Sequence, residues 1–166
     1  MKLKILYPII DGEITGGNII CLRIIEKSLK MGYEVIINSP TEGKFTDILR
    51  QKGIKVYNID TRRSFRLDNA IKLTEIIRKE GINLVHSHTP LAGTILSRLA
   101  GVLAGVPVIN HAHLPDNINT NSFTKYYHLS LNWLTSRFFC AKVIAVSESI
   151  RIEIIKQGVV ANKISV

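Results

Sequence analysis

Short apolar runs alternate with longer segments of helical periodicity along the chain, and this alternation constrains the fold more than any other feature. The apolar runs predict strands at residues 2–9, 33–39, 54–59, 82–88, 106–113, 141–147 and 162–166. The intervening segments predict helices at residues 18–32, 44–53, 67–81, 91–105, 122–139 and 148–158. Strands and helices in strict alternation form a parallel sheet that is covered on both faces. We therefore expect an α/β fold with a doubly wound, Rossmann-like parallel sheet that binds ligands at the carboxyl ends of its strands.

The spacing of apolar residues predicts which face of each helix is buried. In segment 18–32 the inward positions are expected to be Cys21, Ile24, Ile25, Ser28 and Leu29. In segment 67–81 they are expected to be Leu67, Ile71, Thr74 and Ile77. In segment 122–139 they are expected to be Tyr127, Leu131, Leu134 and Phe138. Segment 91–105 is almost wholly apolar, so we expect most of it to be buried.

The chain length and composition are those of one globular domain, which we place at residues 1–166. Hydrophobic residues make up 46% of the chain and charged residues 21%, which argues against disorder. The formal net charge of +9 suits anionic partners such as acidic lipid or phosphorylated substrates, although it also suits solubility alone. No pattern of a nucleic-acid-binding module is present, so we expect no nucleic-acid partner.

The sequence favours a cytoplasmic location. The apolar run near the N-terminus is too short for a signal peptide, and no window is long and apolar enough to span a bilayer. Cys21 and Cys140 lack the spacing of a zinc site and are expected to be reduced core residues. The basic surface leaves open a peripheral position on the inner face of the cell membrane.

The segment "DGEITGG" precedes the predicted helix 18–32 and resembles a phosphate-binding loop. It matches neither GxGxxG nor a P-loop, and Ser39 and Pro40 stand where a dinucleotide-binding domain needs an acidic residue. Binding of NAD is therefore disfavoured. Gly16 and Gly17 still suit the approach of a phosphate or a sugar to the helix N-terminus, while the alternative is a simple tight turn.

Two His-x-His pairs, "VHSH" and "NHAH", lie at the ends of two predicted neighbouring strands. Residues i and i+2 of a strand share a face, so the four imidazoles are expected to cluster. Histidine is a common metal ligand, but no cysteine or carboxylate other than Asp116 stands nearby, and we expect no metal. We assign His86 and His111 to the core, and His88 and His113 to a site that binds a sugar hydroxyl or a phosphate.

The remaining chemistry-bearing residues are few. Asp116 is the only acidic residue between residues 81 and 147, and no pair of carboxylates suggests a glycoside hydrolase. Ser147 follows a predicted strand, and its simplest role is to cap the next helix. The segment "TRRSFR" places three arginines after the third strand, where they suit an acidic lipid, a pyrophosphate-bearing acceptor or merely solvent: Arg62, Arg63 and Arg66.

Taken in order, these segments resemble the N-terminal domain of glycosyltransferase family 4. The resemblance rests on the glycine pair and then on "MGYEVIINSP", "INLVHSHTPLAGTI", "GVPVINHAHLP" and "AKVIAVSESIRIEII", and it runs across nearly the whole chain. Two departures are modest: Tyr33 replaces a histidine that is usual in the family, and His111 is additional.

The resemblance implies one half of a two-domain GT-B architecture, with residues 1–166 on the acceptor side. A C-terminal domain of the same polypeptide, absent from this sequence, would supply most contacts to the nucleotide-sugar donor. The implied reaction transfers a sugar to a glycan or lipid-linked acceptor with retention, without a metal or other cofactor. The implied process is the assembly of cell-surface polysaccharide or glycolipid, and we expect the isolated half to be inactive.

Carried onto this sequence, the resemblance makes His113 the catalytic residue beside the transferred sugar. It places Gly16, Gly17 and Ser147 near the donor phosphates and sugar, and His88 near the acceptor. With the acceptor side we group four further residues: Asp116, Arg62, Arg63 and Arg66.

Two other functions remain open at this point. One is a stand-alone Rossmann-like binding domain without catalysis. The other is the N-terminal half of a nucleotide-sugar epimerase, which shares the two-domain architecture.

Overall fold

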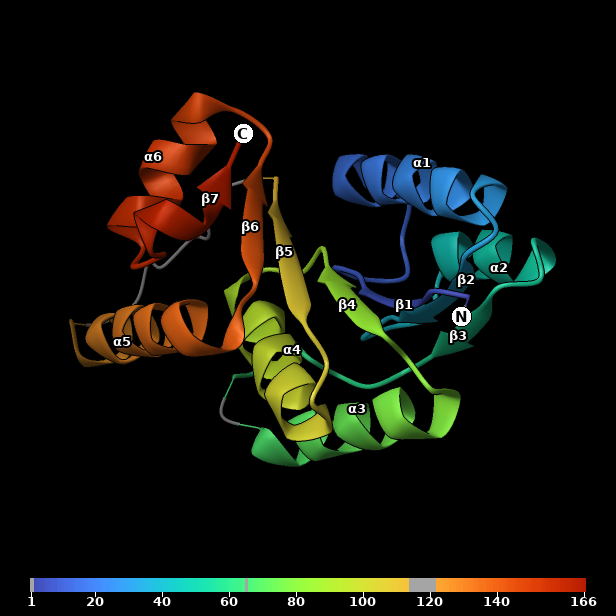
Figure 1. The fold of residues 1–166 in the computed structure, drawn as a ribbon, viewed down its shortest axis with the longest axis horizontal. Coiled ribbons are helices and arrows are strands. Elements are labelled where there is room, and N and C mark those ends of the chain that lie inside the picture. The colour runs from blue at the N-terminus through green and yellow to red at the C-terminus, as the bar shows by residue number, and fades with distance from the viewer. Residues whose placement is uncertain (1, 65, 114–121) are drawn as a thin grey trace.

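The computed structural model describes residues 2–64, 66–113 and 122–166. Its centre is one parallel sheet with the strand order β3-β2-β1-β4-β5-β6-β7 (Figure 1). The strands are β1 (Lys4–Pro8), β2 (Glu34–Asn38), β3 (Lys55–Tyr57), β4 (Leu84–Ser87), β5 (Val108–Ala112), β6 (Lys142–Ala145) and β7 (Ile164–Ser165). Strands of four and five residues that are buried on both faces explain the continuous apolar runs of the sequence.

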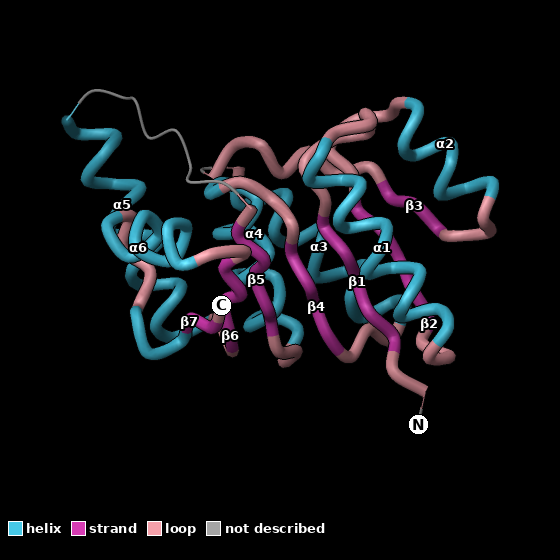
Figure 2. The backbone as a smooth tube through the Cα atoms, turned by 90° about the horizontal axis from the view of Figure 1, so that it is seen from above, coloured by secondary structure: helices cyan, strands magenta, loops and turns pink. Residues whose placement is uncertain are grey.

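Helices connect successive strands and cover the sheet. They are α1 (Gly16–Lys30), α2 (Lys44–Gln51), α3 (Leu67–Glu80), α4 (Leu91–Ala104), α5 (Ser122–Phe139) and α6 (Glu148–Lys156), followed by a 3₁₀ turn at Ala161–Lys163. The helices α1 and α2 lie on one face, and α3, α4 and α5 lie on the other (Figures 1 and 2). The predicted doubly wound α/β fold is thus confirmed.

The strand order reverses beside β1. The chain first builds outward from β1 to β2 and β3, and α3 then carries it across to β4 on the other side of β1. The loops that follow β1 and β4 therefore diverge from adjacent carboxyl ends and leave a crevice between them. The loop that follows β1 leads to Gly16 and Gly17, the first residues of α1, and His88 follows β4.

Two apolar layers hold the helices to the sheet. One joins the sheet to α1 and α2, and it includes Ile5, Cys21, Ile25, Phe45 and Leu49. The other joins the sheet to α3 and α4, and it includes Leu6, Leu73, Ile77, Val85 and Ala100. The free thiols of Cys21 and Cys140 are both buried, as predicted.

The predicted inward face of α3 is wrong in part. Thr74 and Ile77 are buried as expected, but Leu67 and Ile71 are more than half exposed. The buried stripe runs instead through Ala70, Leu73, Thr74, Ile76 and Ile77. Helix α3 packs against α4 as well as against the sheet. Because two neighbours share its buried surface, the buried face of α3 differs from the one that periodicity alone predicts.

The predicted inward face of α5 is wrong at three of its four positions, and the fourth, Leu131, is only partly buried. Tyr127, Leu134 and Phe138 are exposed. The residues of α5 that are buried are polar: Asn132, Thr135 and Ser136. The physical reason is the charged side chain of Arg98, which α4 buries beneath α5 and which needs polar partners there.

Candidate functional site

A cavity of about 630 Å³ lies at the carboxyl edge of the sheet. The loop after β1, the loop after β4 and the end of β5 form its walls, together with parts of α4, α5 and α6. Among the predicted site residues, four line this cavity: Gly16, Gly17, His88 and His113. The sequence therefore identified residues from three separate segments that the fold brings to one place.

The N-terminus of α1 opens on the cavity. Thr15 caps the helix, because its hydroxyl accepts a hydrogen bond from the amide of Asn18 over 3.2 Å. A methyl group at Gly16 would meet no atom within 4 Å, whereas one at Gly17 would lie 3.0 Å from Cδ1 of Ile10. The first amides of a helix lack partners within the helix and carry its positive dipole end, so this wall of the cavity suits an anion.

Two residues that sequence reasoning missed fix this loop. Asn18 is fully buried, and its side-chain amide donates to the backbone oxygens of Asp11 and Glu13 over 3.0 and 2.8 Å. Gly12 packs against the neighbouring loop so closely that a methyl group there would lie 2.4 Å from the carbonyl carbon of Glu42. The glycine that this loop requires is therefore Gly12, whereas Gly16 leaves open space and Gly17 lies close to the side chain of Ile10.

Four histidines form one cluster beside the cavity. His86 and His88 share a face, as do His111 and His113, and their rings stack or tilt on one another at centroid distances of 4.5–5.7 Å. The nearest nitrogens are Nδ1 of His88 and Nε2 of His113, which form a hydrogen bond of 2.9 Å. The clustering that the two His-x-His pairs predicted is present.

The histidine cluster is held in its neutral form. Burial lowers the pKa of His86 and of His111 to about 4, with a further contribution from the neighbouring imidazoles. Burial also lowers the pKa of His88 and of His113. At neutral pH each ring therefore carries one N–H donor and one nitrogen lone pair, and the cavity wall is uncharged here.

Several nitrogens of this cluster have no hydrogen-bond partner among the described residues although they are buried. They are Nε2 of His86, Nε2 of His88, Nδ1 of His111 and Nδ1 of His113. A buried polar atom without a partner costs about 1–3 kcal/mol. Atoms left in this state beside a cavity are typical of a site that a ligand completes.

A second polar group of the interior, centred on Arg98, was not foreseen. Arg98 is only 1% exposed, and its guanidinium donates to Oδ1 of Asn110 over 2.7 Å and to Oδ1 of Asn132 over 2.8 Å. It also donates to the hydroxyl of Thr135 over 3.1 Å. The signal in the sequence was a single arginine within the apolar segment "LAGTILSRLAGVLAG". Arg98 is among the residues that line the cavity, and its hydrogen bonds join α4 to β5 and α5.

The other predicted site residues lie elsewhere. Ser147 is not among the residues that line the cavity; it caps α6, and its hydroxyl accepts from the amide of Ile150 over 3.3 Å. Asp116 lies outside the described residues.

The three arginines after β3 do not line the cavity either. Arg62 forms a two-bond ion pair with Asp60, and the Arg62 guanidinium lowers the pKa of the Asp60 carboxyl to about 2. Arg66 pairs with Asp68 in the same way. Arg63 is exposed and has no ion-pair partner in the part of the chain that the structure covers.

The parallel sheet, its switch point and the cavity at that edge define an α/β domain of the doubly wound class, in which ligands commonly bind at such an edge. The chain belongs to Glycosyltransferase Family 4, whose model matches residues 14–166. No curated protein matches it in sequence.

Solved structures share its fold. HepE from Anabaena, crystallised in complex with UDP, is 18% identical with a TM-score of 0.77, over 98% of this chain and 43% of HepE. A glycosyltransferase from Rickettsia africae is 22% identical with a TM-score of 0.70, over 99% of this chain and 42% of that protein. A UDP-N-acetylglucosamine 2-epimerase is 16% identical with a TM-score of 0.67, over 100% of this chain and 48% of the epimerase. The chain thus spans less than half the length of each of them.

Proposed function

We propose that this chain is the acceptor-side half of an enzyme that transfers a sugar from a nucleoside-diphosphate sugar to a hydroxyl of a glycan or lipid-linked acceptor. The observation that carries the proposal is the cavity of about 630 Å³, which joins the N-terminus of α1 to His113 across the switch point of the sheet. The family match supports the reaction class. A C-terminal domain of the same polypeptide would close over this edge and bind the nucleotide.

In the proposed reaction, the acceptor oxygen forms a bond to C1 of the sugar while the bond from C1 to the diphosphate oxygen breaks. The diphosphate leaves with the electron pair, and with retention the acceptor approaches from the same face and gives its proton to the departing oxygen. Charge therefore develops on the diphosphate. We assign its stabilisation to the amides of Gly16 and Gly17, because they stand at the positive end of α1.

His113 is the residue that we assign to the transferred sugar. Its lowered pKa keeps the ring neutral, so it serves as a hydrogen-bonding group rather than as a cation. Its Nε2 bonds to His88, and its Nδ1 has no partner among the described residues. Nδ1 is then available to a sugar hydroxyl, and His88 holds the ring in place. No metal or other cofactor is needed for these steps, and none is proposed for them.

The acceptor is proposed to be presented by an anionic membrane, on whose inner face the protein would lie in the cytoplasm, in the assembly of cell-surface polysaccharide or glycolipid. Support comes from the net charge of +9 and from the aromatic side chains that α5 exposes, among them Phe123, Tyr126 and Phe138. No helix within the described ranges is long and apolar enough to cross a bilayer. Sedimentation with liposomes tests this: binding should require anionic lipid and weaken at high salt, and binding to neutral liposomes at high salt would contradict it.

The test of the reaction uses the polypeptide with its C-terminal domain and a panel of nucleotide sugars that begins with UDP-glucose, with which HepE has also been crystallised. His113→Ala should lower kcat at least about 100-fold, by analogy with the loss of one positioned donor. Gly16→Val should raise KM for the donor, because the new side chain enters the cavity without disturbing the packing. The control is His128→Ala, on α5, whose ring lies 3.3 Å from the hydroxyl of Ser64 and does not line the cavity. Unchanged transfer in both site variants would overturn the site assignment.

The fold likeness to an epimerase supports one rival function. An epimerase converts a nucleotide sugar without any acceptor, so incubation of the enzyme with UDP-N-acetylglucosamine alone separates the two. Acceptor-independent epimerisation would replace the transferase proposal. A reading frame that ends near residue 166 would instead favour the binding domain without catalysis.

A further inference from the structure

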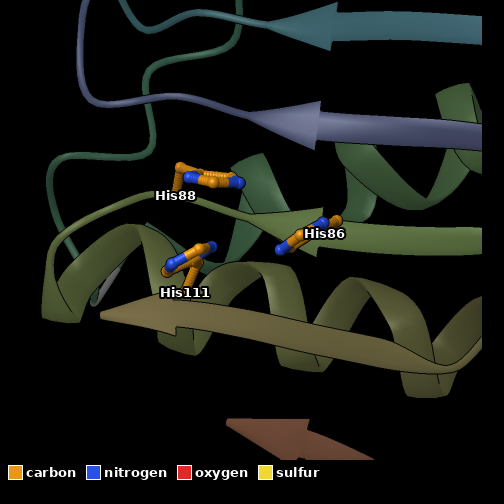
Figure 3. A group of neighbouring side chains, drawn as sticks. All are labelled: His86, His88 and His111. Atoms are coloured by element: carbon orange, nitrogen blue, oxygen red, sulfur yellow. The ribbon is translucent and has the colours of Figure 1, made fainter. Parts of the chain in front are cut away.

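Three histidines approach one another on one face of β4 and β5. His86 lies on β4, His88 directly follows that strand, and His111 lies on β5. One ligand nitrogen of each lies within 4.8 Å of the other two (Figure 3). Figure 3 shows the three rings grouped above the two neighbouring strands.

The backbone of the sheet fixes this arrangement. His86 pairs in register with Ile109, and two residues further along each strand come His88 and His111. The two-residue repeat of a strand therefore puts all three side chains on the same face. Sites that are built on strands are held more closely than sites on loops.

The nitrogens at this place lack partners and are neutral. Nε2 of His86, Nε2 of His88 and Nδ1 of His111 are buried without a hydrogen-bond partner among the described residues. His88 is only 1% exposed and His86 only 9%. The other nitrogen of His88 is bonded to His113 over 2.9 Å, which orients the ring as an outer-shell partner orients a metal ligand.

We propose that His86, His88 and His111 form a binding site for a transition-metal ion such as Zn²⁺, with a fourth position open to the cavity. All three ligands are imidazoles, a set that suits Zn²⁺, Cu²⁺ and Ni²⁺ and does not suit Mg²⁺ or Ca²⁺. Tetrahedral Zn²⁺ needs ligand nitrogens about 3.4 Å apart. The nitrogens here lie within 4.8 Å of one another, so binding requires them to approach by up to about 1.4 Å. The proposal departs from the expectation from sequence that no metal binds, and it does not depend on the glycosyltransferase activity.

The position of the ion would couple it to the cavity. His88 and His111 both line the cavity, and His88 is hydrogen-bonded to His113. An ion on the triad would hold His88, and through it His113, in one orientation. Under this proposal, the orientation of His88 and His113 in the cavity wall depends on whether a metal ion is bound to the triad.

The experiment uses the 166-residue chain without an affinity tag, stripped with a chelator and then titrated with Zn²⁺ and Co²⁺. Calorimetry should give one Zn²⁺ per chain. Co²⁺ should give the visible absorption of a tetrahedral nitrogen site without the intense ultraviolet bands of a thiolate, because the group of ligand atoms consists of His86, His88 and His111 and includes no cysteine. A stoichiometry of zero, or thiolate bands, would overturn the proposal.

Variants assign the ligands. His86→Ala and His111→Ala should each weaken Zn²⁺ binding at least about 100-fold, the upper end of what loss of an outer-shell partner costs. His128→Ala is the matched control and should bind as the unaltered chain does. His113→Ala removes only the orienting bond and should cost about tenfold. A loss in His113→Ala as large as in the ligand variants would overturn the assignment to three histidines.

A measurement on the unaltered chain guards against variants that fail to fold. In ¹⁵N spectra of the imidazole rings, Zn²⁺ should shift nitrogen resonances of three rings and leave that of His128 in place. Shifts confined to His128, or spread evenly over all five histidines, would indicate adventitious binding and overturn the proposal.

Discussion

The two halves of the sheet have interiors of opposite character. Around β1, β2 and the helices α1 and α2, the space between sheet and helices is filled mainly by apolar side chains such as Ile5, Ile25 and Phe45. Around β4 and β5 the interior instead contains a fully buried arginine, Arg98, and a cluster of histidines. Both interiors belong to one continuous sheet.

The difference between the two interiors indicates where we expect a ligand to bind. A polar interior is stable when its groups bond to one another, and the guanidinium of Arg98 has partners on β5 and α5. The histidine nitrogens lack such partners among the described residues. Within the polar half, the first group stabilises the fold, and the second is the place where we propose that a ligand binds.

The largest effect is expected from removal of the buried guanidinium. Arg98→Ala should lower the free energy of unfolding by about 4 kcal/mol, because Asn110, Asn132 and Thr135 lose their donor inside the protein. Denaturant unfolding measures it. Arg23→Ala, at an exposed position of α1, is the control and should change stability by no more than about 0.5 kcal/mol. Equal effects of the two changes would contradict the account of a polar half that Arg98 organises.

The next effect is expected from acidification of the histidine cluster in the presence of a chelator. The folded pKa of His86 and of His111 is about 4, below the unfolded value near 6.5, so the unfolded chain binds protons first as pH falls. The contribution of these two neutral histidines to the free energy of unfolding is therefore fully present above pH 6.5 and is lost as pH falls toward 4. From pH 7 to pH 5 the loss should be about 4 kcal/mol for the two groups together.

Denaturant unfolding at a series of pH values measures this loss. Asp60 and Asp68 titrate at lower pH, because hydrogen bonds from Arg62 and Arg66 depress their pKa values, so their contribution falls outside this interval. His111→Asn should flatten the profile. A flat profile in the unaltered chain would show that the cluster is not held neutral.

A smaller effect is expected in the apolar half. Ile25→Val removes one buried methyl group from the layer between α1 and the sheet and should cost about 1 kcal/mol. Ile152→Val makes the same change where the side chain is 51% exposed and should cost within about 0.5 kcal/mol. Thermal or denaturant unfolding compares the two. An Ile25→Val variant as stable as Ile152→Val would mean that this half is loosely packed.

The smallest effect is expected on the outer face of α5. Tyr126→Gln should leave the free energy of unfolding unchanged within about 0.5 kcal/mol, because the ring is 69% exposed and packs little. A loss above about 2 kcal/mol would indicate that the aromatic face of α5 packs against part of the protein. Denaturant unfolding of the variant and of the unaltered chain measures this difference.

The order of elements and the fold class could be predicted from the sequence because they depend on periodicity. The strands are short apolar runs, and a glycine in the left-handed region caps two of the helices, Gly81 after α3 and Gly105 after α4. The burial of α5 could not be predicted this way. Its aromatic stripe has the period of a buried face, and only the position of Arg98 on a neighbouring helix reverses the preference.

The candidate site was predictable to a similar extent. Gly16, Gly17, His88 and His113 follow strands, and topology alone brings such residues together. The roles of Asn18 and Gly12 depend on contacts with particular atoms of other loops, which no local pattern reveals. The pairing of Arg62 and Arg66 with carboxylates two residues away was visible in principle, since Asp60 and Asp68 are near in sequence.

The strand β3 forms one edge of the sheet. A sheet edge offers unpaired backbone groups to other chains, and long flat edges invite them to join. Here β3 has only three residues, and Lys55 places its ammonium over the ring of Tyr57 while pairing with Glu80. A strand so short, with a charge beside it, is a poor template for another strand. The short β3 edge therefore has few unpaired backbone groups to which another chain could add a strand, and this disfavours polymerisation through the sheet.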